Sequence, residues 1–267
     1  MEYHGTCAKS LAVFSKLLVK VPRWIFAFIA TTITILIKPF SKRAKLALVM
    51  PGGRFYFIIM FRKWFVVPGR QEVFQFILPR PFESRILVKR GDIVLEGGSA
   101  LGEDTVRLAE LVGDGKVIAV EPNPWNLVFL KYNTHYYENI IIVDSALWDK
   151  EGIMQLKLQG TLGSSIVSDT KGVRCVAVST TTIDDIITDF RLGKVDVIKL
   201  NIEGAEIEAL KGARKVLSMA REVLVAAHHI RDGKLTVFDV VKILSQYGFK
   251  VKVVHGILAR YYVVAKK

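Results

Sequence analysis

One stretch of the sequence decides the fold: DIVLEGGSALGEDT, at residues 92–105. It starts as a short apolar run, reaches an acid at Glu96, passes through a glycine-containing turn and then takes on a helical pattern. A second apolar run, Val117–Glu121, also ends in an acid. In parallel α/β sheets, ligands bind beyond the carboxyl ends of the strands, where such turns lie. The stretch therefore predicts a nucleoside-binding crevice at that edge of a sheet.

The alternation of strand and helix patterns continues to the end of the chain. Short, continuous apolar runs are expected for strands buried on both faces, with helices between them. The last two runs are joined by a short turn around His255-Gly256, which permits only an antiparallel pair. We predict an α/β fold, a doubly wound, mostly parallel seven-stranded sheet with a C-terminal antiparallel hairpin strand. Its strands are Ile93–Glu96, Val117–Glu121, Ile140–Asp144, Val195–Asn201, Val223–Ala227, Phe249–Val254 and Tyr261–Val264, with an inserted pair at Ile153–Leu158 and Val173–Val178.

Basic residues are concentrated before this α/β pattern. Residues 1–90 hold 16 Lys or Arg and 3 Asp or Glu, whereas residues 91–267 hold 22 of each kind. The basic part is also apolar, and its uninterrupted apolar stretch at 24–37 would form a helix roughly 21 Å long, short of the roughly 30 Å hydrocarbon core. Starting at Leu17 gives a spanning length. The combination favours an anionic membrane surface over nucleic acid, with a buried helix as the alternative.

These observations divide the chain into three expected parts. They are an apolar, basic helical extension at 1–45, a cap segment on the substrate side at 46–90, and an α/β domain at 91–267. We expect residues 1–63 to meet an anionic membrane surface, and the protein to be cytoplasmic and membrane-associated. The two cysteines lie far apart, which fits a reducing compartment and offers no Cys/His metal site.

The turn after the first strand indicates the kind of ligand. Gly98 and Gly102 let the backbone approach a ligand closely, but they lie four residues apart and do not form the G-x-G-x-x-G that seats a pyrophosphate. An acid at Glu96 would repel a phosphate and would suit a sulfonium or an ammonium group. S-adenosylmethionine carries both and has no phosphate; the structural alternative is a glycine turn with an acidic helix cap. The predicted cofactor contacts here are Glu96, Gly98, Ser99, Gly102 and Thr105.

The ends of the second and third strands extend the predicted cofactor site. Glu121 is placed to accept the ribose hydroxyls, and Asn123 precedes a proline as the N-cap of the next helix. Asp144 and Ser145 end the third strand, beside the expected position of the adenine. For Glu121 and Asp144 the alternative is an acid in a surface turn.

The fourth and fifth strand ends supply the catalytic candidates, which are Asn201, Glu203 and His228. Glu203 and Glu206 are placed to orient a substrate hydroxyl or the methionine amine, or else they complement a helix dipole. A histidine at the end of the fifth strand is placed to act as a general base, and strand alternation directs either His228 or His229 inward.

The run Thr181–Asp185 offers a carboxylate pair, but a metal role is not its preferred interpretation. A Thr followed three residues later by an acid is typical of a helix N-terminal cap. We therefore predict a cap here and no metal site.

Together the motifs resemble the FkbM-type methyltransferases, a branch of the class I S-adenosylmethionine-dependent enzymes with a Rossmann-like sheet. The resemblance covers roughly residues 88–230 and implies methyl transfer, usually to an oxygen of a sugar or natural product. Glu96 and Asn201 stand where the family usually has Asp, and Ala100 replaces a common Asn. The loss of charge at Asn201 bears against a base role there. The motifs are E-x-G-x-x-x-G-x-x-T at 96–105, EPNP at 121–124, SAL at 145–147, SS at 164–165, TTIDD at 181–185 and KLNIEGAE at 199–206.

The hypothesis from sequence is therefore an S-adenosylmethionine-dependent O-methyltransferase. Its expected acceptor is a small-molecule, glycan or glycolipid hydroxyl. The alternatives are an NAD(P)- or nucleotide-sugar-dependent enzyme on a related sheet, and a non-enzymatic membrane-surface binding protein, the latter suggested by Asn201.

Overall fold

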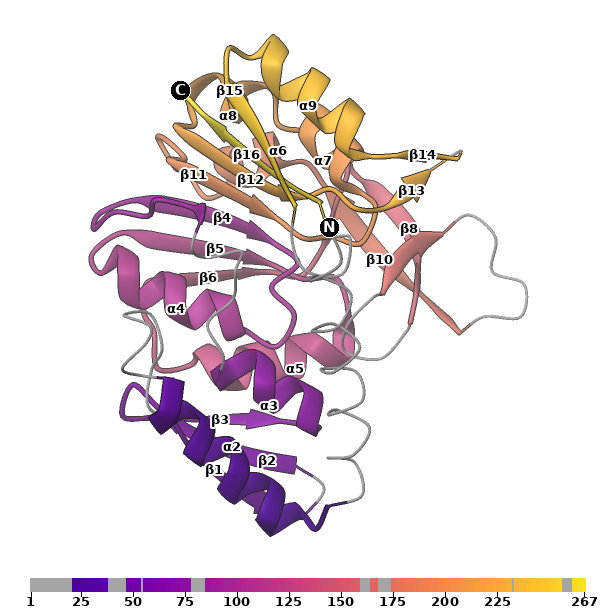
Figure 1. The fold of residues 1–267 in the computed structure, drawn as a ribbon. Coiled ribbons are helices and arrows are strands. Elements are labelled where there is room, and N and C mark those ends of the chain that lie inside the picture. The colour runs from indigo at the N-terminus through magenta and orange to yellow at the C-terminus, as the bar shows by residue number, and fades with distance from the viewer. Residues whose placement is uncertain are drawn as a thin grey trace, which may run out of the picture. The chain divides into compact units, whose positions relative to one another are not determined.

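The computed structural model divides the chain into two compact units, Met1–Glu83 and Ser84–Lys267. Of the predicted features, residues 1–20 and 38–45 of the extension, Val173 of the inserted pair and the turn at 256–260 lie outside the described residues. The structure describes residues 21–37, 47–53, 55–77, 85–158, 164–167, 174–231, 233–255 and 261–267 (Figure 1).

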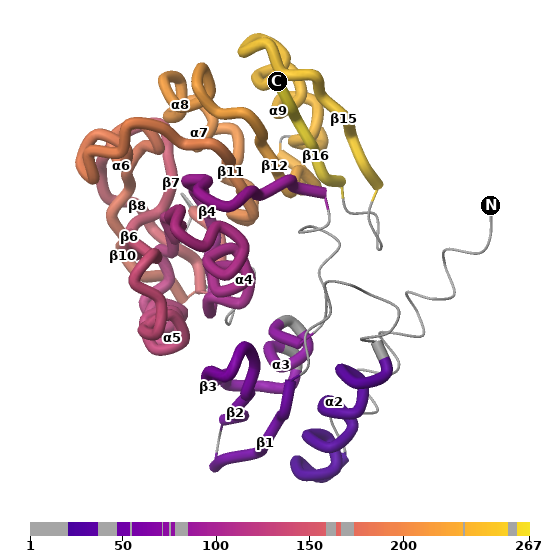
Figure 2. The backbone as a smooth tube through the Cα atoms, turned by 90° about the vertical axis from the view of Figure 1, so that its left-hand side faces the viewer, coloured from indigo at the N-terminus to yellow at the C-terminus, as the bar shows by residue number. Residues whose placement is uncertain are grey.

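The first unit contains the predicted apolar helix. Helix α2 runs from Arg23 to Ile37 and lies alongside β1 in the tube view (Figure 2). The α2 residues Phe26 and Ala30, one turn apart, are fully buried, and the Phe26 ring meets the Tyr56 ring edge-on at 5.2 Å. Among the described residues, no helix is long and apolar enough to cross a membrane. The other elements of this unit are β1 (Leu48–Gly52), β2 (Phe55–Met60), β3 (Lys63–Val67) and α3 (Arg70–Ile77).

Threonine hydroxyls join α2 to the sheet of this unit. Thr31 Oγ1 accepts the Val49 N–H at 2.9 Å, and Thr34 Oγ1 donates to the Ala47 carbonyl at 3.1 Å. The described strands pair antiparallel in the order β1-β2-β3. The sequence suggested the extension and the cap segment as separate parts. In the structure, the helix of the first and the strands of the second lie in one compact unit.

The second unit holds the predicted sheet. In its described part, seven strands lie in the order β15-β16-β12-β11-β4-β5-β6, and every pair is parallel except those that involve β16. The prediction of a mostly parallel seven-stranded sheet is confirmed, with each strand end within two residues of its expected place. The strands are β4 (Ile93–Gly97), β5 (Lys116–Val120), β6 (Ile140–Val143), β11 (Val197–Leu200), β12 (Glu222–Ala226), β15 (Lys250–His255) and β16 (Tyr261–Lys266).

The C-terminal hairpin enters the sheet in a particular way. Strand β16 turns back from β15 and lies between β15 and β12, antiparallel to both. It is the antiparallel strand that the short link required. The remaining strands all place their carboxyl ends at one edge, where the sequence predicted the site.

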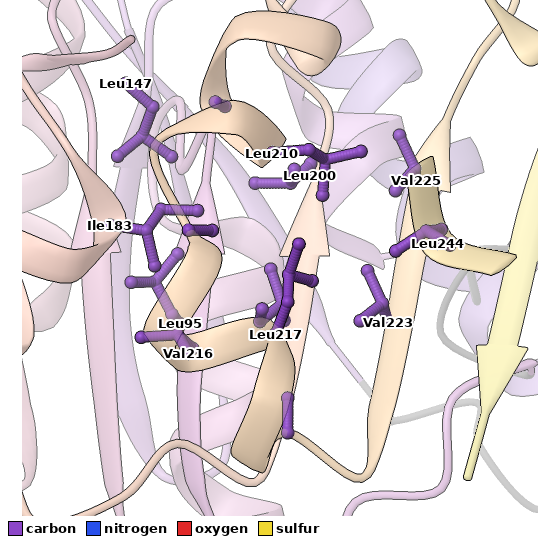
Figure 3. Packing of buried hydrophobic residues seen from close by; sticks show 14 of the residues in the cluster. Leu95, Leu147, Ile183, Leu200, Leu210, Val216, Leu217, Val223, Val225 and Leu244 are labelled. Carbon is purple, nitrogen blue, oxygen red and sulfur yellow. The ribbon is translucent and has the colours of Figure 1, made fainter. Parts of the chain in front are cut away.

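Helices cover both faces of the sheet, because alternate residues of each strand point to opposite sides. On one face, Leu95, Leu200 and Val223 from neighbouring strands pack beneath Val216 and Leu217 of α8 (Figure 3). On the other, Ala119 packs with Leu127 and Leu130 of α5. The helices are α4 (Glu103–Val112), α5 (Pro124–Thr134), α6 (Ile183–Asp189), α7 (Glu206–Lys211), α8 (Arg214–Met219) and α9 (Val237–Gln246).

The predicted inserted strand pair is also present. Strand β8 (Gly152–Lys157) pairs antiparallel with β10 (Cys175–Thr181). Within the described residues they form a smaller sheet in the order β7-β10-β8-β9, where β7 is Ala146–Leu147 and β9 is Ser165–Val167. A short ladder of β13 (Ile230–Arg231) and β14 (Lys234–Leu235) follows β12.

The run at 181–185 forms the predicted helix cap. Thr182 is the N-cap of α6; its Oγ1 accepts the Asp185 N–H at 2.9 Å and donates to the Asp185 carboxylate at 2.6 Å. In the described part of the chain, no group of three or more His, Cys, Asp or Glu could hold a metal ion. The carboxylate at this position therefore serves the helix end.

This cap gives a first prediction. We expect T182A to lower the free energy of unfolding by about 1 kcal/mol, because it leaves a helix N–H without its acceptor. The melting temperature would fall by about 2–4 °C in thermal denaturation. The control is T188A, which removes a hydroxyl that bonds the Asp184 carbonyl inside the same helix and is expected to change little. Equal losses in the two variants would contradict the assignment.

Candidate active site

The glycine turn after β4 crosses the end of β11. Gly98 has φ +79°, and a Cβ at this position would lie 2.1 Å from the Asn201 carbonyl oxygen. The N–H groups of Gly98 and Ser99 both reach the Val120 carbonyl, at 3.0 and 3.2 Å. The turn is therefore held between the ends of β5 and β11, and a side chain at position 98 would force them apart.

Beneath this turn lies a buried ion-pair cluster around Lys199. The Lys199 ammonium is 2.5 Å from Glu96 Oε1 and 2.7 Å from Asp104 Oδ2, and all three side chains are at most 4 % exposed. Lys199 faces Glu96 because the two are paired in the parallel register of β11 and β4. Burial alone would lower the pKa of Lys199, but the charges of Asp104 and Glu96 outweigh it and the pKa is raised. The lysine therefore stays charged.

Three of the predicted cofactor contacts belong to this cluster. Burial raises the pKa of the fully enclosed Glu96, and the nearby Lys199 charge opposes that rise. Glu96 Oε2 accepts from the Thr105 hydroxyl at 2.5 Å and from the Ser99 hydroxyl at 3.3 Å. The cation that Glu96 faces in this structure is Lys199, and the Ser99 and Thr105 hydroxyls bond to Glu96. The predicted contact of these three side chains with a cofactor stays a prediction.

Lys199 is part of the sequence motif at 199–206, but the sequence did not lead us to predict a role for it. The sequence did indicate a buried charge here, because Lys199 is the one charged residue in the apolar run 197–200. The structure shows that all four residues of this strand are buried. A lysine at such a position requires a buried partner.

Glu121 lies just past β5, as predicted for a ribose ligand. Its Oε2 accepts the Ala100 N–H at 2.8 Å, and its Oε1 accepts the Asn123 N–H at 2.9 Å and the Asn126 amide at 3.1 Å. A carboxylate oxygen accepts two hydrogen bonds, so one acceptor position remains on Oε2. Burial raises the pKa of Glu121 to about 7, although the Asn123 and Ala100 N–H groups oppose the rise.

The neighbouring predicted residues differ in how they are placed. Asn123 is the N-cap of α5, accepting the Trp125 N–H at 3.0 Å, and its amide donates to the Ser164 hydroxyl at 3.2 Å. Ser145 Oγ lies 3.0 Å from Ser179 Oγ. Asp144 is exposed, and its carbonyl accepts from the same Ser179 hydroxyl. Asn123 is thus tied to the motif at 164–165, whereas Asp144 lies toward solvent.

The loop after β11, which carries the predicted catalytic residues, has an unusual backbone. Glu203 has φ +54° and Gly204 has φ +105°, so a residue with a side chain occupies the left-handed region. Glu206 holds this loop: its Oε1 accepts the N–H groups of Ile202 at 3.3 Å and Gly204 at 3.2 Å. Burial raises the pKa of Glu206, opposed by His229. These bonds therefore hold the backbone on both sides of Glu203.

His229 lies near these carboxylates. Its Nε2 is 3.7 Å from Glu206 Oε1 and 3.9 Å from Glu203 Oε2. The His228 ring stacks on it, with centroids 4.5 Å apart. The chain has left β12 by this point, so alternation along the strand does not decide which ring faces the loop. Of the two candidates, the structure brings His229 together with Glu203.

Glu203 and His229 are among the residues that line a cavity of about 410 Å³. Glu203, Gly204 and His229 form its sheet side, and residues of the inserted sheet form the opposite wall. Neither Asn201 nor His228 is among the lining residues. The lining residues that sequence reasoning missed are Trp148, Met154, Ser165, Ile166, Ala205, Ile230, Arg231 and Thr236.

Comparison with known proteins identifies a family and similar folds. A family model described as the methyltransferase FkbM domain matches residues 96–251, more than half of the chain. A SAM-dependent methyltransferase from Aquifex aeolicus is 16 % identical with a TM-score of 0.44, over 72 % of this chain and 90 % of that one. Fibrillarin from Aeropyrum pernix, solved with natively bound S-adenosyl-L-methionine, is 14 % identical with a TM-score of 0.45, over 81 % and 97 %. No curated protein sequence matches the chain.

The Lys199 cluster gives a second prediction. We expect K199M to lower the free energy of unfolding by about 3–5 kcal/mol in urea denaturation, because two buried carboxylates lose their counter-charge. The control is K194M, which removes a pair of similar length, 3.0 Å to Asp196, from a lysine that is 57 % exposed. We expect at most about 1 kcal/mol there. Similar losses of unfolding free energy in K199M and K194M would contradict the prediction that the buried cluster stabilises the fold more than an exposed ion pair does.

The pKa of Glu121 gives a third prediction. The unfolded chain loses this proton near pH 4.5, whereas the folded protein keeps it up to about pH 7. The folded state therefore binds more protons between these values, so this contribution to stability is complete below the lower value and is lost as the pH rises through the upper one. We expect a loss of about 3 kcal/mol. Urea denaturation at several pH values should show a shallower pH dependence in E121Q than in the wild type; identical slopes would contradict it.

Proposed function

The chain belongs to the FkbM methyltransferase family, and from that premise we propose that it methylates a hydroxyl oxygen of a sugar, glycan or glycolipid. The methyl donor is S-adenosylmethionine, the cofactor of the class I methyltransferases to which this family belongs. The choice of an oxygen acceptor is supported chiefly by one observation: His229 and the Glu203 carboxylate both line a cavity at the carboxyl edge of the sheet, and the buried Glu206 carboxylate lies 3.7 Å from His229 Nε2.

The residues on the first two strand ends fit this cofactor. In the ionised form of Glu121, the acceptor position left on Oε2 suits a ribose hydroxyl, which can donate a hydrogen bond. The ammonium of Lys199 is occupied by Glu96 and Asp104, so it is not offered to a phosphate. Gly98 keeps the turn free of a side chain close to the end of β11. In this proposal Glu121 and the backbone of the turn hold the nucleoside.

On the acceptor side the proposal gives His229 the role of general base. When bound, S-adenosylmethionine supplies an electrophilic methyl group on a sulfonium centre that leaves as a neutral thioether. The His229 imidazole accepts the proton that the acceptor hydroxyl loses as its oxygen forms the new bond to carbon. Glu203 and Glu206, each within 4 Å of His229 Nε2, stabilise the imidazolium that results.

The composition of the cavity supports a hydroxyl-bearing acceptor. Trp148 and Met154 offer apolar contact, while Ser165, Arg231 and Thr236 offer hydrogen-bonding groups. A sugar presents the same mixture of an apolar ring face and polar edges. We further propose that the enzyme works in the cytoplasm beside an anionic membrane surface, which would bring a lipid-linked acceptor within reach.

A fourth prediction tests the base. We expect H229A to lower methyl transfer by about 10²–10⁴-fold, measured with labelled S-adenosylmethionine and glycan, lipid and small-molecule fractions. Binding of S-adenosylhomocysteine, followed by calorimetry, should be unchanged because His229 lies on the acceptor side. H228A is the comparison and should lose much less.

Three results would contradict parts of this proposal. A larger loss in H228A than in H229A would move the base to the other ring. Label found exclusively in protein or nucleic acid would overturn the glycan or lipid acceptor. Failure of the wild type to bind S-adenosylhomocysteine would overturn the cofactor site itself.

A further inference from the structure

Helix α2 has a second apolar face that the core of its unit does not use. Trp24 and Phe28 are 67 % and 71 % exposed, and Ile35 is 57 % exposed. Their spacing of four and then seven residues places them on one stripe of the helix, within 40° of one another at 100° per residue. The buried stripe, which includes Phe26 and Ala30, lies on the other side. The helix is thus apolar on both sides.

Such a helix is unusual at a protein surface in contact with water. Beyond Arg23 at its first position, α2 carries no charged residue in its 15 positions. A helix that is hydrophobic all round is normally enclosed by protein or by lipid. One side of α2 packs in its own unit and the other side is an exposed apolar stripe. That exposed stripe suits a helix that lies in the plane of a membrane interface.

The charge around α2 selects the kind of surface. Residues 1–63 hold 11 Lys or Arg and 1 Asp or Glu. Basic residues flank the helix in sequence on both sides, at Lys16 and Lys20 before it and at Lys38 and Lys42 after it. Each basic residue near an anionic lipid surface adds to binding, whereas a second copy of the chain would bring the same positive charge and be repelled. A nucleic acid would satisfy the charge but leave the apolar stripe in water.

We propose that α2 lies in the interface of an anionic lipid membrane, with Trp24, Phe28 and Ile35 in contact with the acyl layer. Trp24 is suited to this position, because tryptophan side chains favour the boundary between headgroups and acyl chains. The inference rests on the exposed stripe and the basic segment, and it holds whichever molecule accepts the methyl group.

Flotation of the full-length protein with vesicles tests the proposal. We expect at least tenfold stronger binding to vesicles of equal parts phosphatidylglycerol and phosphatidylcholine than to phosphatidylcholine alone, with binding weakened at about 0.5 M salt. F28E should reduce binding at least tenfold. The matched control is F238E on α9, whose side chain is 70 % exposed, nearly the same as Phe28, and which should bind as the wild type does.

A second variant and three further measurements make the outcome decisive. I35E places the charge near the other end of the stripe and should also weaken binding, with melting temperatures showing that both variants fold. The proposal would be overturned if the wild-type protein did not bind anionic vesicles. It would also be overturned if F28E and I35E bound them as tightly as the wild type. The proposal would also be overturned if the wild type did not bind vesicles, formed a dimer in sedimentation velocity, and became a monomer in the F28E variant. S-adenosylhomocysteine binding reports separately on the proposed methyltransferase site.

Discussion

The site edge depends on one buried contact, the ammonium of Lys199 between Glu96 and Asp104. Strands β4 and β11 are the neighbours at which the order of the sheet reverses, where α/β proteins bind their ligands. The Lys199 charge joins the end of β11 to the end of β4 and, through Asp104, to the first turn of α4. Because each of these charges would be costly to bury alone, the three elements must stay together. The glycine turn above them is fixed as a result.

Buried carboxylates also hold the strained backbone on either side of this point. Ala100, at φ 48°, donates its N–H to Glu121, and Gly204, which follows Glu203 at φ 54°, donates its N–H to Glu206. Side-chain-bearing residues are uncommon in the left-handed region, and asparagine tolerates it better than alanine. Glu121 and Glu206 thus hold the turns at Ala100 and Glu203 in their left-handed conformations.

The sequence was informative where local pattern and topology coincide. Buried parallel strands are continuous apolar runs, so their limits could be predicted, and strand-end residues such as Glu121 and Glu203 followed from the shared edge. The pairing of Lys199 with Glu96 needed the strand register, which no local pattern contains. The choice of His229 over His228 depended on a backbone that has already left its strand. The cavity wall at Trp148 and Met154 could not be predicted, because it depends on which residues of the smaller sheet line the same cavity as Glu203 and His229.

In the proposed mechanism, this arrangement separates reaction chemistry from acceptor choice. His229 and Glu203 come from loops that the main sheet positions, whereas Met154, Ser165 and Ile166 belong to the inserted sheet and line the same cavity. The proposed base and the edge proposed to hold the nucleoside are therefore both built on the main sheet. The volume and polarity of the rest of the cavity depend on the inserted sheet. Under the proposal, changes in the inserted strands alter which acceptor enters while leaving the Lys199 cluster intact, because the two sheets contribute different groups to the cavity.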